Sequence, residues 1–314
     1  MESSSRFRGI PDIIYGTAFK FDDTAALVAV ALKAGFRAID TAANKPQYQE
    51  ALVGEGIAAA LESGVMQRSE LFIQTKFSPA KAGRDPAIYP YDTTKSIPEQ
   101  VEESLSSSLT RLGVTYIDGL VLHSLYPNIE DTLTAWRAME SFVPSKVSYL
   151  GLSNVDVDSL RQVYDAATVK PSSIQNRFTQ DTVPNPDADL PPGLPYPDVA
   201  YDRDVREYCK TTNITYVPWG VLWSNPAILD DDPEQLLART AQKIGVSKQA
   251  LYYSCLRNLG GCQVSILCGT TKEATMQEVL AGLDKLQRYL LESEENKKIW
   301  QVCVDHVRSI ANGM

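Results

Sequence analysis

The sequence predicts an α/β protein of the (β/α)8 barrel class, with long loops at the carboxyl ends of its strands. Eight short apolar runs alternate with segments of helical spacing along its 314 residues, and such alternation implies βαβ units and a parallel sheet. Eight units in a chain of this length fit a closed barrel better than an open doubly wound sheet. The open sheet would favour a G-x-G-x-x-G motif after the first strand, and none follows it. We therefore expect one domain that spans residues 1–314.

The apolar runs give the expected strands and the spacing between them gives the expected helices. The strands are expected at residues 13–19, 36–42, 71–77, 117–123, 147–154, 172–178, 213–219 and 263–270. Apolar residues at helical spacing include Val53, Ile57, Ala60 and Leu61, then Val101, Leu105, Leu109 and Leu112, and then Trp136 and Met139.

Composition excludes several classes of function. The net charge is −9, which argues against a nucleic-acid partner, because phosphate binding requires a basic face. No run of about 18 apolar residues is present, so we expect no membrane span. The five cysteines are odd in number and form no C-x-x-C pair, and the start lacks the apolar stretch of a secretory signal. These features predict a globular cytoplasmic protein with reduced thiols.

Two segments rich in Pro, Asp and Gly interrupt the regular alternation. Residues 78–97 follow the third expected strand and residues 179–201 follow the sixth. In a barrel both would leave the carboxyl ends of strands, where sites are built. We expect them to form the walls of a substrate pocket; disorder is the alternative for each.

Three consecutive strands end in titratable residues. The second ends at Asp40, the third carries Lys76 near its end, and the fourth ends at His123. Because strand residues alternate, Lys76 shares one face with Phe72 and Gln74. A buried ammonium there needs a counter-charge, and Asp40 on the neighbouring strand is the nearest candidate. His123 alone would more often be structural, whereas three such residues at one end of the barrel indicate a site.

Tyr48 adds a proton donor to this group. A phenol has a pKa near 10, and a neighbouring ammonium lowers it. We expect Asp40 to hold Lys76 in place, Lys76 to lower the pKa of Tyr48, and His123 to orient a carbonyl oxygen. No cluster with metal-ligand spacing is visible, so no metal is expected. The other histidine, His306, lies in a polar helix and is expected to be a surface or packing residue.

The sequence resembles the aldo-keto reductases along nearly its whole length. The resemblance is carried by GTA, GFRAIDTA, Tyr48-x-Glu50 with VGEGI, QTKF, VLH, GLSN and IQNRF. It implies a catalytic tetrad of Asp40, Tyr48, Lys76 and His123. It also implies a nicotinamide cofactor, usually NADP(H), that lies across the barrel mouth.

The same resemblance implies which residues hold the cofactor. Ser153, Asn154 and Gln175 match residues that hydrogen-bond the nicotinamide carboxamide. Thr17 and Asp40 belong to the same site. The segment from 209 to 223 fits the seventh strand of the family, which places Trp219 against the nicotinamide, with Gly220 and Leu222 beside it. A packing role for Trp219 and a stacking role for Tyr216 are the alternatives.

The segment after the last strand departs from the family. Where the family has a Lys-Ser pair and an Arg for the 2′-phosphate, this chain has Gly269, Thr270 and Thr275. Backbone N–H groups of Gly269 and Thr270 near a helix start could hold a phosphate, and Lys272 could replace the charge. A surface role for Lys272 and use of NAD(H) are the alternatives. Glu278 matches a position that contacts adenine.

The function expected from this resemblance is NADPH-dependent interconversion of a carbonyl and an alcohol, with Tyr48 as the general acid and base. Aromatic residues just beyond strand ends are the expected contacts of a small carbonyl substrate, although packing could explain each one: Phe19, Phe77, Tyr126 and Trp223. Two other functions stay open. One is a cofactor-binding regulatory barrel with negligible turnover, and the other is a biosynthetic isomerase or dehydratase that uses the same acid.

The spacing between Asp40 and Tyr48 is unusual for the family. The family places its Tyr five residues after the Asp, whereas AANKPQ widens the separation to eight here. We expect this longer turn, with Asn44, Lys45 and Pro46, to bulge outward while Tyr48 still reaches the mouth near Lys76.

Overall fold

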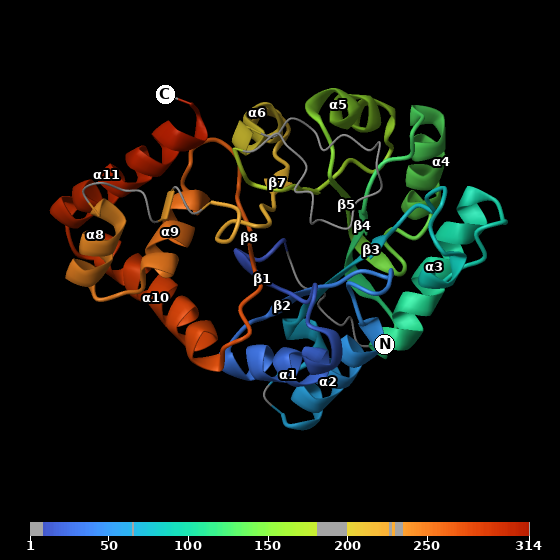
Figure 1. Cartoon of the computed structure of the whole chain (residues 1–314), viewed down its shortest axis with the longest axis horizontal. Helices are drawn as coiled ribbons and strands as arrows, with labels where there is room; N and C mark the ends of the chain where they lie inside the picture. The colour runs from blue at the N-terminus through green and yellow to red at the C-terminus, as the bar shows by residue number, and fades with distance from the viewer. Residues whose placement is uncertain (1–8, 65, 181–199, 226–227, 230–234, 314) are drawn as a thin grey trace.

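A computed structural model describes residues 9–64, 66–180, 200–225, 228–229 and 235–313 (Figure 1). Its centre is a ring of parallel strands with helices around the outside. In chain order the strands are β1 Ile13–Gly16, β2 Ala38–Asp40, β3 Phe72–Phe77, β4 Ile117–Leu122, β5 Val147–Ser153, β6 Ser173–Gln175, β7 Thr215–Tyr216 and β8 Ile266–Cys268.

The strands pair as neighbours in the order β7-β6-β5-β4-β3-β2-β1-β8. A bridge between Tyr216 and Val264 joins β7 to the segment just before β8, which closes the ring. Two backbone hydrogen bonds support the closure: Tyr216 donates to Gln263 over 2.8 Å, and Ser265 donates to Tyr216 over 2.9 Å. The predicted (β/α)8 barrel is thus confirmed.

All eight expected strands are present, but each is shorter than its apolar run. The shortest strand lies within residues 213–219, of which only Thr215 and Tyr216 belong to β7. Backbone pairing nevertheless continues beyond this strand, because Trp219 donates to the carbonyl oxygen of Asn176 over 2.9 Å. Apolar runs therefore located the strands and overestimated their lengths, since buried residues continue into the loops.

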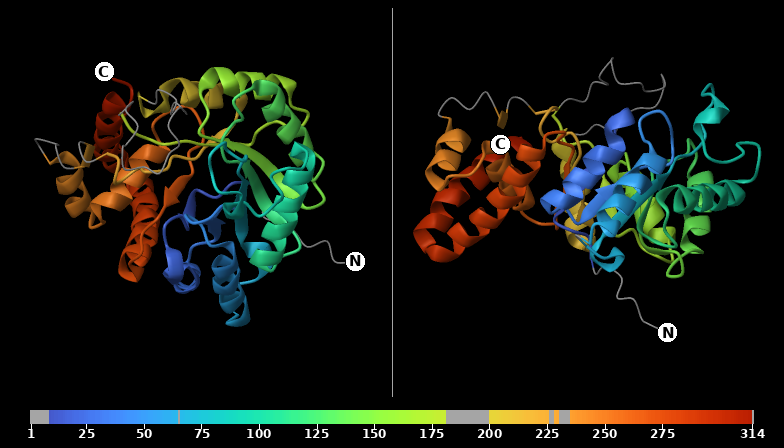
Figure 2. Two further views of the ribbon diagram at one scale, coloured as in Figure 1. Left: turned by 45° about the vertical axis from the view of Figure 1, so that its right-hand side comes forward. Right: turned by 90° about the horizontal axis from the view of Figure 1, so that it is seen from below.

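The helices lie outside the ring, and α10 and α11 lie together on the side opposite α3 and α4 (Figures 1 and 2). The described helices are α1 Thr24–Ala34, α2 Glu50–Glu62, α3 Ile97–Leu112, α4 Ile129–Glu140, α5 Val157–Ala166, α6 Arg203–Thr212, α8 Leu236–Ile244, α9 Lys248–Arg257, α10 Glu273–Glu292 and α11 Glu294–Ala311. No helix in the described ranges is long and apolar enough to cross a membrane.

Local sequence explains where α3 begins and ends. Ser96 and Glu99 form a reciprocal capping box at its start, and Pro98 occupies the first turn. At its end Gly113 takes a left-handed conformation with φ of 66°, which a glycine adopts without steric cost. The capping residues thus set the point at which the chain leaves the loop that follows β3.

Two layers of packing support the mouth of the barrel. Inside the ring, Ile14, Ala38, Phe72 and Val217 form a small apolar cluster. A larger cluster fills the space between the strands and the outer helices. Because strand residues alternate, the next inward residue on β2 is Asp40 and the next on β3 is Gln74. A polar layer of inward-facing side chains therefore follows the small apolar cluster toward the carboxyl ends of the strands.

Candidate functional site

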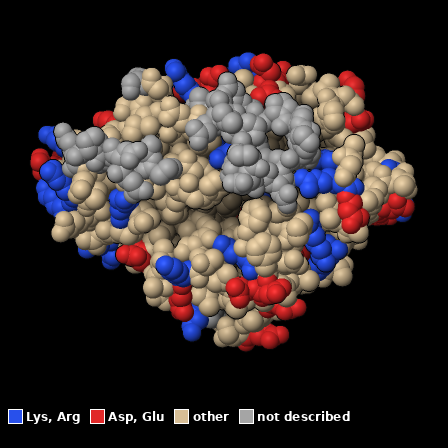
Figure 3. Space-filling model, in the orientation of Figure 1, with Lys and Arg blue, Asp and Glu red and all other residues tan. Residues whose placement is uncertain are grey.

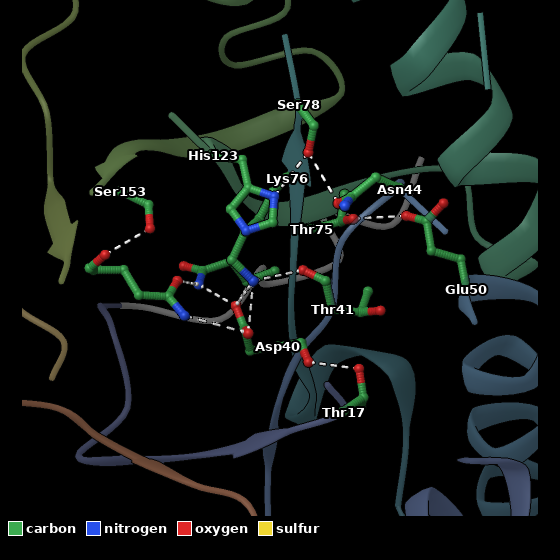
Figure 4. Close-up of polar contacts among 12 residues, drawn as sticks. Thr17, Asp40, Thr41, Asn44, Glu50, Thr75, Lys76, Ser78, His123 and Ser153 are labelled. Atoms are coloured by element: carbon green, nitrogen blue, oxygen red, sulfur yellow. Dashed lines mark hydrogen bonds and ion pairs between the residues drawn. The ribbon is translucent and has the colours of Figure 1, made fainter. Parts of the chain in front are cut away.

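Asp40 and Lys76 form a buried ion pair at the ends of β2 and β3. Lys76 Nζ lies 2.7 Å from both carboxylate oxygens of Asp40 and also donates to the Thr41 carbonyl oxygen over 2.8 Å (Figure 4). Each residue is 1% exposed. Burial lowers the pKa of Lys76, and the negative charge of Asp40 opposes that shift. The expected counter-charge for Lys76 is confirmed.

Amide side chains complete the polar layer around this pair. Gln74 Nε2 donates to Asp40 over 2.7 Å and to Gln175 Oε1 over 3.1 Å, while Gln175 Nε2 lies 3.3 Å from the other Asp40 oxygen. Thr17 Oγ1 donates to the Asp40 carbonyl oxygen over 2.9 Å. Side chains from β3 and β6 thus converge on one carboxylate at the end of β2 and fix its orientation, while Thr17 after β1 holds the backbone of the same residue.

Tyr48 lies beside both Lys76 and His123. Lys76 Nζ is 5.0 Å from the centre of the Tyr48 ring, and the Tyr48 and His123 rings meet edge to face with centres 5.8 Å apart. The longer turn therefore does return Tyr48 to the mouth. The expected lowering of its pKa is wrong in this structure: burial, followed by the charge of Asp40, raises the pKa of Tyr48.

The turn between β2 and Tyr48 is held from both sides. Gln47 accepts a backbone hydrogen bond from Phe19 over 2.8 Å, and Lys45 donates to Ile88 over 3.2 Å. Lys45 and Pro46 are exposed at its outer edge. Since Ile88 belongs to the loop after β3, the insertion is braced by a neighbouring loop of the barrel mouth.

His123 is positioned through Ser78 and Asn44, two residues that sequence reasoning missed. Its Nδ1 lies 2.7 Å from Ser78 Oγ, and Ser78 Oγ donates to Asn44 Oδ1 over 3.0 Å (Figure 4). Burial and the positive charge of Lys76 hold the pKa of His123 well below its usual range, so the ring is neutral. The direction of the Asn44–Ser78–His123 chain then sets which ring nitrogen carries the proton.

The residues expected to hold the nicotinamide lie around the same strand ends. Ser153 Oγ donates to the Gln175 carbonyl oxygen over 2.6 Å, and Asn154 Nδ2 donates to the His123 carbonyl oxygen over 2.9 Å. Trp219 is half-buried. Tyr216, the alternative stacking ring, is buried with its hydroxyl bonded to Asp202 over 3.0 Å. Trp219 is therefore the more accessible of the two rings.

The segments after β7 and β8 carry the remaining expected contacts. Gly220 has φ of 73°, which requires the conformational freedom of glycine, and Leu222 is partly buried beside the core. Lys272 is exposed and directly precedes α10, with its N–H 3.4 Å from Thr270 Oγ1. Gly269 is exposed. On α10 itself, Thr275 is half-buried and Glu278 is exposed.

Lys20 is a further cation that sequence reasoning missed. It is 9% exposed and donates to the carbonyl oxygen of Gly269, which joins the loops after β1 and β8. Burial lowers its pKa. A lysine shortly after the strand in GTAFK was the available signal, because it parallels Lys76 near the end of β3.

The four expected substrate contacts occupy different environments. Phe19 and Trp223 are exposed, at 64% and 63%, and Tyr126 is half-buried. Phe77 does not fit the expectation, since it is 1% exposed and packs against Tyr91 within the core. Lys76 points inward, so alternation turns Phe77 outward, toward the helices. His306 is half-buried in α11, outside this group.

The two long loops also differ. Residues 78–97 are described, and Tyr91 anchors them by donating to the Ser78 carbonyl oxygen over 2.6 Å. This loop therefore folds back on Ser78, its own first residue, which contacts His123. Most of the second loop, residues 181–199, lies outside the described residues.

Buried polar atoms near the mouth fit the binding of a cofactor. Arg177 Nε and Ser224 Oγ are both buried with no hydrogen-bond partner in the described parts of the chain. Both residues lie close in sequence to positions expected to contact the cofactor, Gln175 and Leu222. A bound molecule rich in oxygen acceptors would satisfy such donors.

Comparison with known proteins agrees with this geometry. Residues 12–232 match the Aldo/keto reductase family. The glyoxal reductase of Bacillus subtilis is 30% identical over 69% of this chain and 63% of its own length, so this match spans less than two thirds of that relative. The D/L-glyceraldehyde reductase of Hypocrea jecorina is 31% identical over 74% of this chain and 68% of its own length.

Solved structures share the fold. A silkworm (Bombyx mori) aldo-keto reductase (AKR2E5) complexed with NADPH superposes with a TM-score of 0.67, at 20% identity, over 93% of this chain and 84% of its own. An aldo-keto reductase from a deep-sea metagenome of the Medee basin also reaches 0.67, at 21% identity, over 94% and 92%. With the barrel, the polar layer at its mouth and these matches together, the chain belongs to the Aldo/keto reductase family.

Proposed function

We propose that this protein is an NAD(P)H-dependent reductase that interconverts a small carbonyl compound and its alcohol, with Tyr48 as the general acid and base. The observation that carries the proposal is the position of Tyr48, with its ring 5.0 Å from the Lys76 ammonium and 5.8 Å from the His123 ring. A bound nicotinamide would supply the hydride. The chain must then supply one proton to the carbonyl oxygen and hold that oxygen in place.

Each member of the group has a distinct task in this proposal. Tyr48 keeps its proton at neutral pH, since a phenol has a pKa near 10 and burial raises the pKa of Tyr48 further, so it is a donor at rest. When the proton leaves, the adjacent Lys76 ammonium stabilises the phenolate. Asp40 holds Lys76 through both of its oxygens and keeps it charged. His123 borders the same space and orients the carbonyl oxygen when its Nε2 carries the proton, which requires the Ser78 hydroxyl to turn from Asn44 and donate to Nδ1.

NADP(H) is the proposed cofactor, with NAD(H) as the alternative. We assign the carboxamide contacts to Ser153, Asn154 and Gln175 and the stacking ring to Trp219. Support for a phosphorylated cofactor comes from the silkworm relative, which was solved with NADPH. In this chain the available cations near β8 are the buried Lys20 and the exposed Lys272.

The test is NADPH consumption, followed by its near-ultraviolet absorbance, with a panel of aromatic and aliphatic aldehydes and ketones. We expect turnover of at least one class, with loss of one NADPH for each alcohol formed. Binding of NADPH without turnover of any carbonyl would favour a regulatory barrel instead. Conversion of a substrate without net loss of cofactor would favour an isomerase or dehydratase.

A further inference from the structure

Among the residues that the structure describes, Arg177 is a buried cation with no anionic partner. It is 8% exposed, its guanidinium carbon lies 5.2 Å from the centre of the Trp223 ring, and its Nε makes no hydrogen bond within the described ranges. No ion pair of Arg177 is found there either. Arg206 is comparably buried, at 5%, but donates to three different oxygens. Buried guanidinium groups normally donate hydrogen bonds to several oxygens, as Arg206 does.

Backbone pairing places Arg177 at the mouth of the barrel. Gln175 is the last residue of β6 and reaches inward to Asp40. Residues two apart on a strand share a face, and pairing continues here because Arg177 bridges Trp219 in parallel register. Arg177 therefore follows Gln175 on the inner side, roughly 7 Å further toward the opening.

A second unsatisfied donor lies in the adjoining segment. Ser224 Oγ is buried without a hydrogen-bond partner among the described residues. It is close to Gly220, because a Cβ built on Gly220 would come within 2.9 Å of Ser224 Oγ and 3.4 Å of the Trp223 ring. The ring that Arg177 stacks upon is thus flanked by an orphaned hydroxyl, while Trp223 itself is 63% exposed.

The net charge of the protein does not explain why a buried arginine has no ion pair within the described part of the chain. The protein carries a net charge of −9, yet its mouth-side face is hollowed near the centre with Lys or Arg atoms around the hollow (Figure 3). A planar guanidinium recognises carboxylate and phosphate oxygens through paired N–H donors. The ring of Trp223 offsets part of the cost of removing the guanidinium from water.

We propose that Arg177, with Ser224 beside it, binds an oxyanion group of a molecule held at the mouth, either a carboxylate of the carbonyl substrate or the diphosphate of the cofactor. This assignment deepens the proposed reductase function. Only the substrate carboxylate, and not the cofactor diphosphate, requires that the proposed function be correct. It makes Arg177 a binding residue, since it carries no proton in the reaction.

The substrate arm uses two aldehydes that differ only in charge, para-carboxybenzaldehyde and its methyl ester. If the oxyanion belongs to the substrate, Arg177→Gln raises KM for the acid about tenfold, leaves KM for the ester unchanged, and barely alters kcat. Arg161→Gln is the matched control, because Arg161 also stacks on a ring, that of Tyr208, but is exposed and paired with Asp158. Arg177→Lys should recover part of the loss.

The cofactor arm measures binding of NADPH and NADH by quenching of tryptophan fluorescence. If the oxyanion is the diphosphate, Arg177→Gln raises both dissociation constants together by about tenfold. A change for NADPH alone would instead point to the 2′-phosphate and would overturn the assignment. The assignment is also overturned if Arg177→Gln matches Arg161→Gln in both arms.

Two further measurements test the binding role of Arg177 independently of turnover and of protein stability. Titration of para-carboxybenzaldehyde into NADP+-loaded Tyr48→Phe protein, with and without Arg177→Gln, reports binding even if no carbonyl is ever turned over. Thermal unfolding of Arg177→Gln should show no loss of stability, because an unpaired buried charge is removed. A large drop in Tm would mean that Arg177 is a structural residue and would contradict the proposal.

Discussion

At the scale of single residues, the hydroxyl of Ser78 decides how His123 is held. It lies between His123 Nδ1 and Asn44 Oδ1, at 2.7 and 3.0 Å. Ser78→Ala removes one hydrogen bond from a neutral ring, so we expect kcat to fall about tenfold with the dissociation constant of NADPH unchanged. Steady-state kinetics and fluorescence titration measure the two quantities.

If Ser78 positions the His123 ring, it also determines which ring nitrogen carries the proton, and this can be measured. Nitrogen NMR of ring-labelled histidine is tractable because the chain has only two histidines, and His306→Asn assigns the signals. Ser78→Ala should shift the His123 nitrogens, whereas Ser106→Ala, an exposed change on α3, should not. Unchanged nitrogens in Ser78→Ala would show that Ser78 does not position the ring.

Sequence reasoning found the site residues at strand ends and missed those whose contacts join two loops. Asp40, Lys76 and His123 could be predicted because alternation and strand order bring strand ends together. Ser78 and Asn44 could not, because their contact joins an inserted turn to a different loop. Phe77 was misplaced for a local reason, since it faces away from the side occupied by Lys76.

At the scale of elements, α2 packs unusually close to α1. A Cβ built on Gly56 would lie 2.6 Å from the backbone oxygen of Ala25 and 2.7 Å from Val28 Cβ. Gly56→Ala must therefore push the helices apart, and we expect a loss of about 2 kcal/mol in the free energy of unfolding. Denaturant titration measures it, with the exposed Glu55→Ala as a control expected within about 0.5 kcal/mol of the wild type. Equal stability of the two variants would contradict this packing.

The start of α6 contains a carboxyl group whose ionisation opposes folding. Burial raises the pKa of Asp202 to about 7, whereas an unfolded Asp titrates near 4. Between about pH 4 and pH 7 the folded state therefore binds a proton that the unfolded state lacks, so stability falls as pH rises. Above about pH 7 that stabilising contribution is fully lost.

Asp202→Asn should remove this dependence while keeping the bond from the Tyr216 hydroxyl, and Asn tolerates the left-handed backbone at this position, where φ is 57°. We expect the gain in stability over the wild type to be about 2.5 kcal/mol larger at about pH 8 than at about pH 5. Thermal unfolding at both pH values measures it. The exposed Asp204→Asn serves as control, and an identical pH slope in the wild type and Asp202→Asn would refute the argument.

Element positions were predictable because each strand is an apolar run bounded by helical spacing. Element ends were not, as β7 shows, because apolar residues such as Val217 stay buried after the regular ladder stops. Backbone pairing beyond that point depends on the partner segment near Asn176. The apolar pattern of one segment does not show how far its backbone pairs with a neighbouring segment.

At the scale of the whole molecule, the ring is closed through β7 and β8 and surrounded by one continuous core. We propose that residues 1–314 form a single domain. Calorimetric unfolding should then show one transition, with the calorimetric enthalpy equal to the van't Hoff enthalpy. Two resolved transitions would contradict a single cooperative unit.

The central claim concerns the proton on Tyr48, and single-turnover oxidation of bound NADPH by a carbonyl substrate tests it most directly. Tyr48→Phe keeps the ring beside Lys76 and His123 and removes only the hydroxyl. We expect hydride transfer to slow by about a hundredfold or more, with NADPH bound as tightly as in the wild type. A rate within about threefold of the wild type, at unchanged NADPH binding, would show that another group donates the proton.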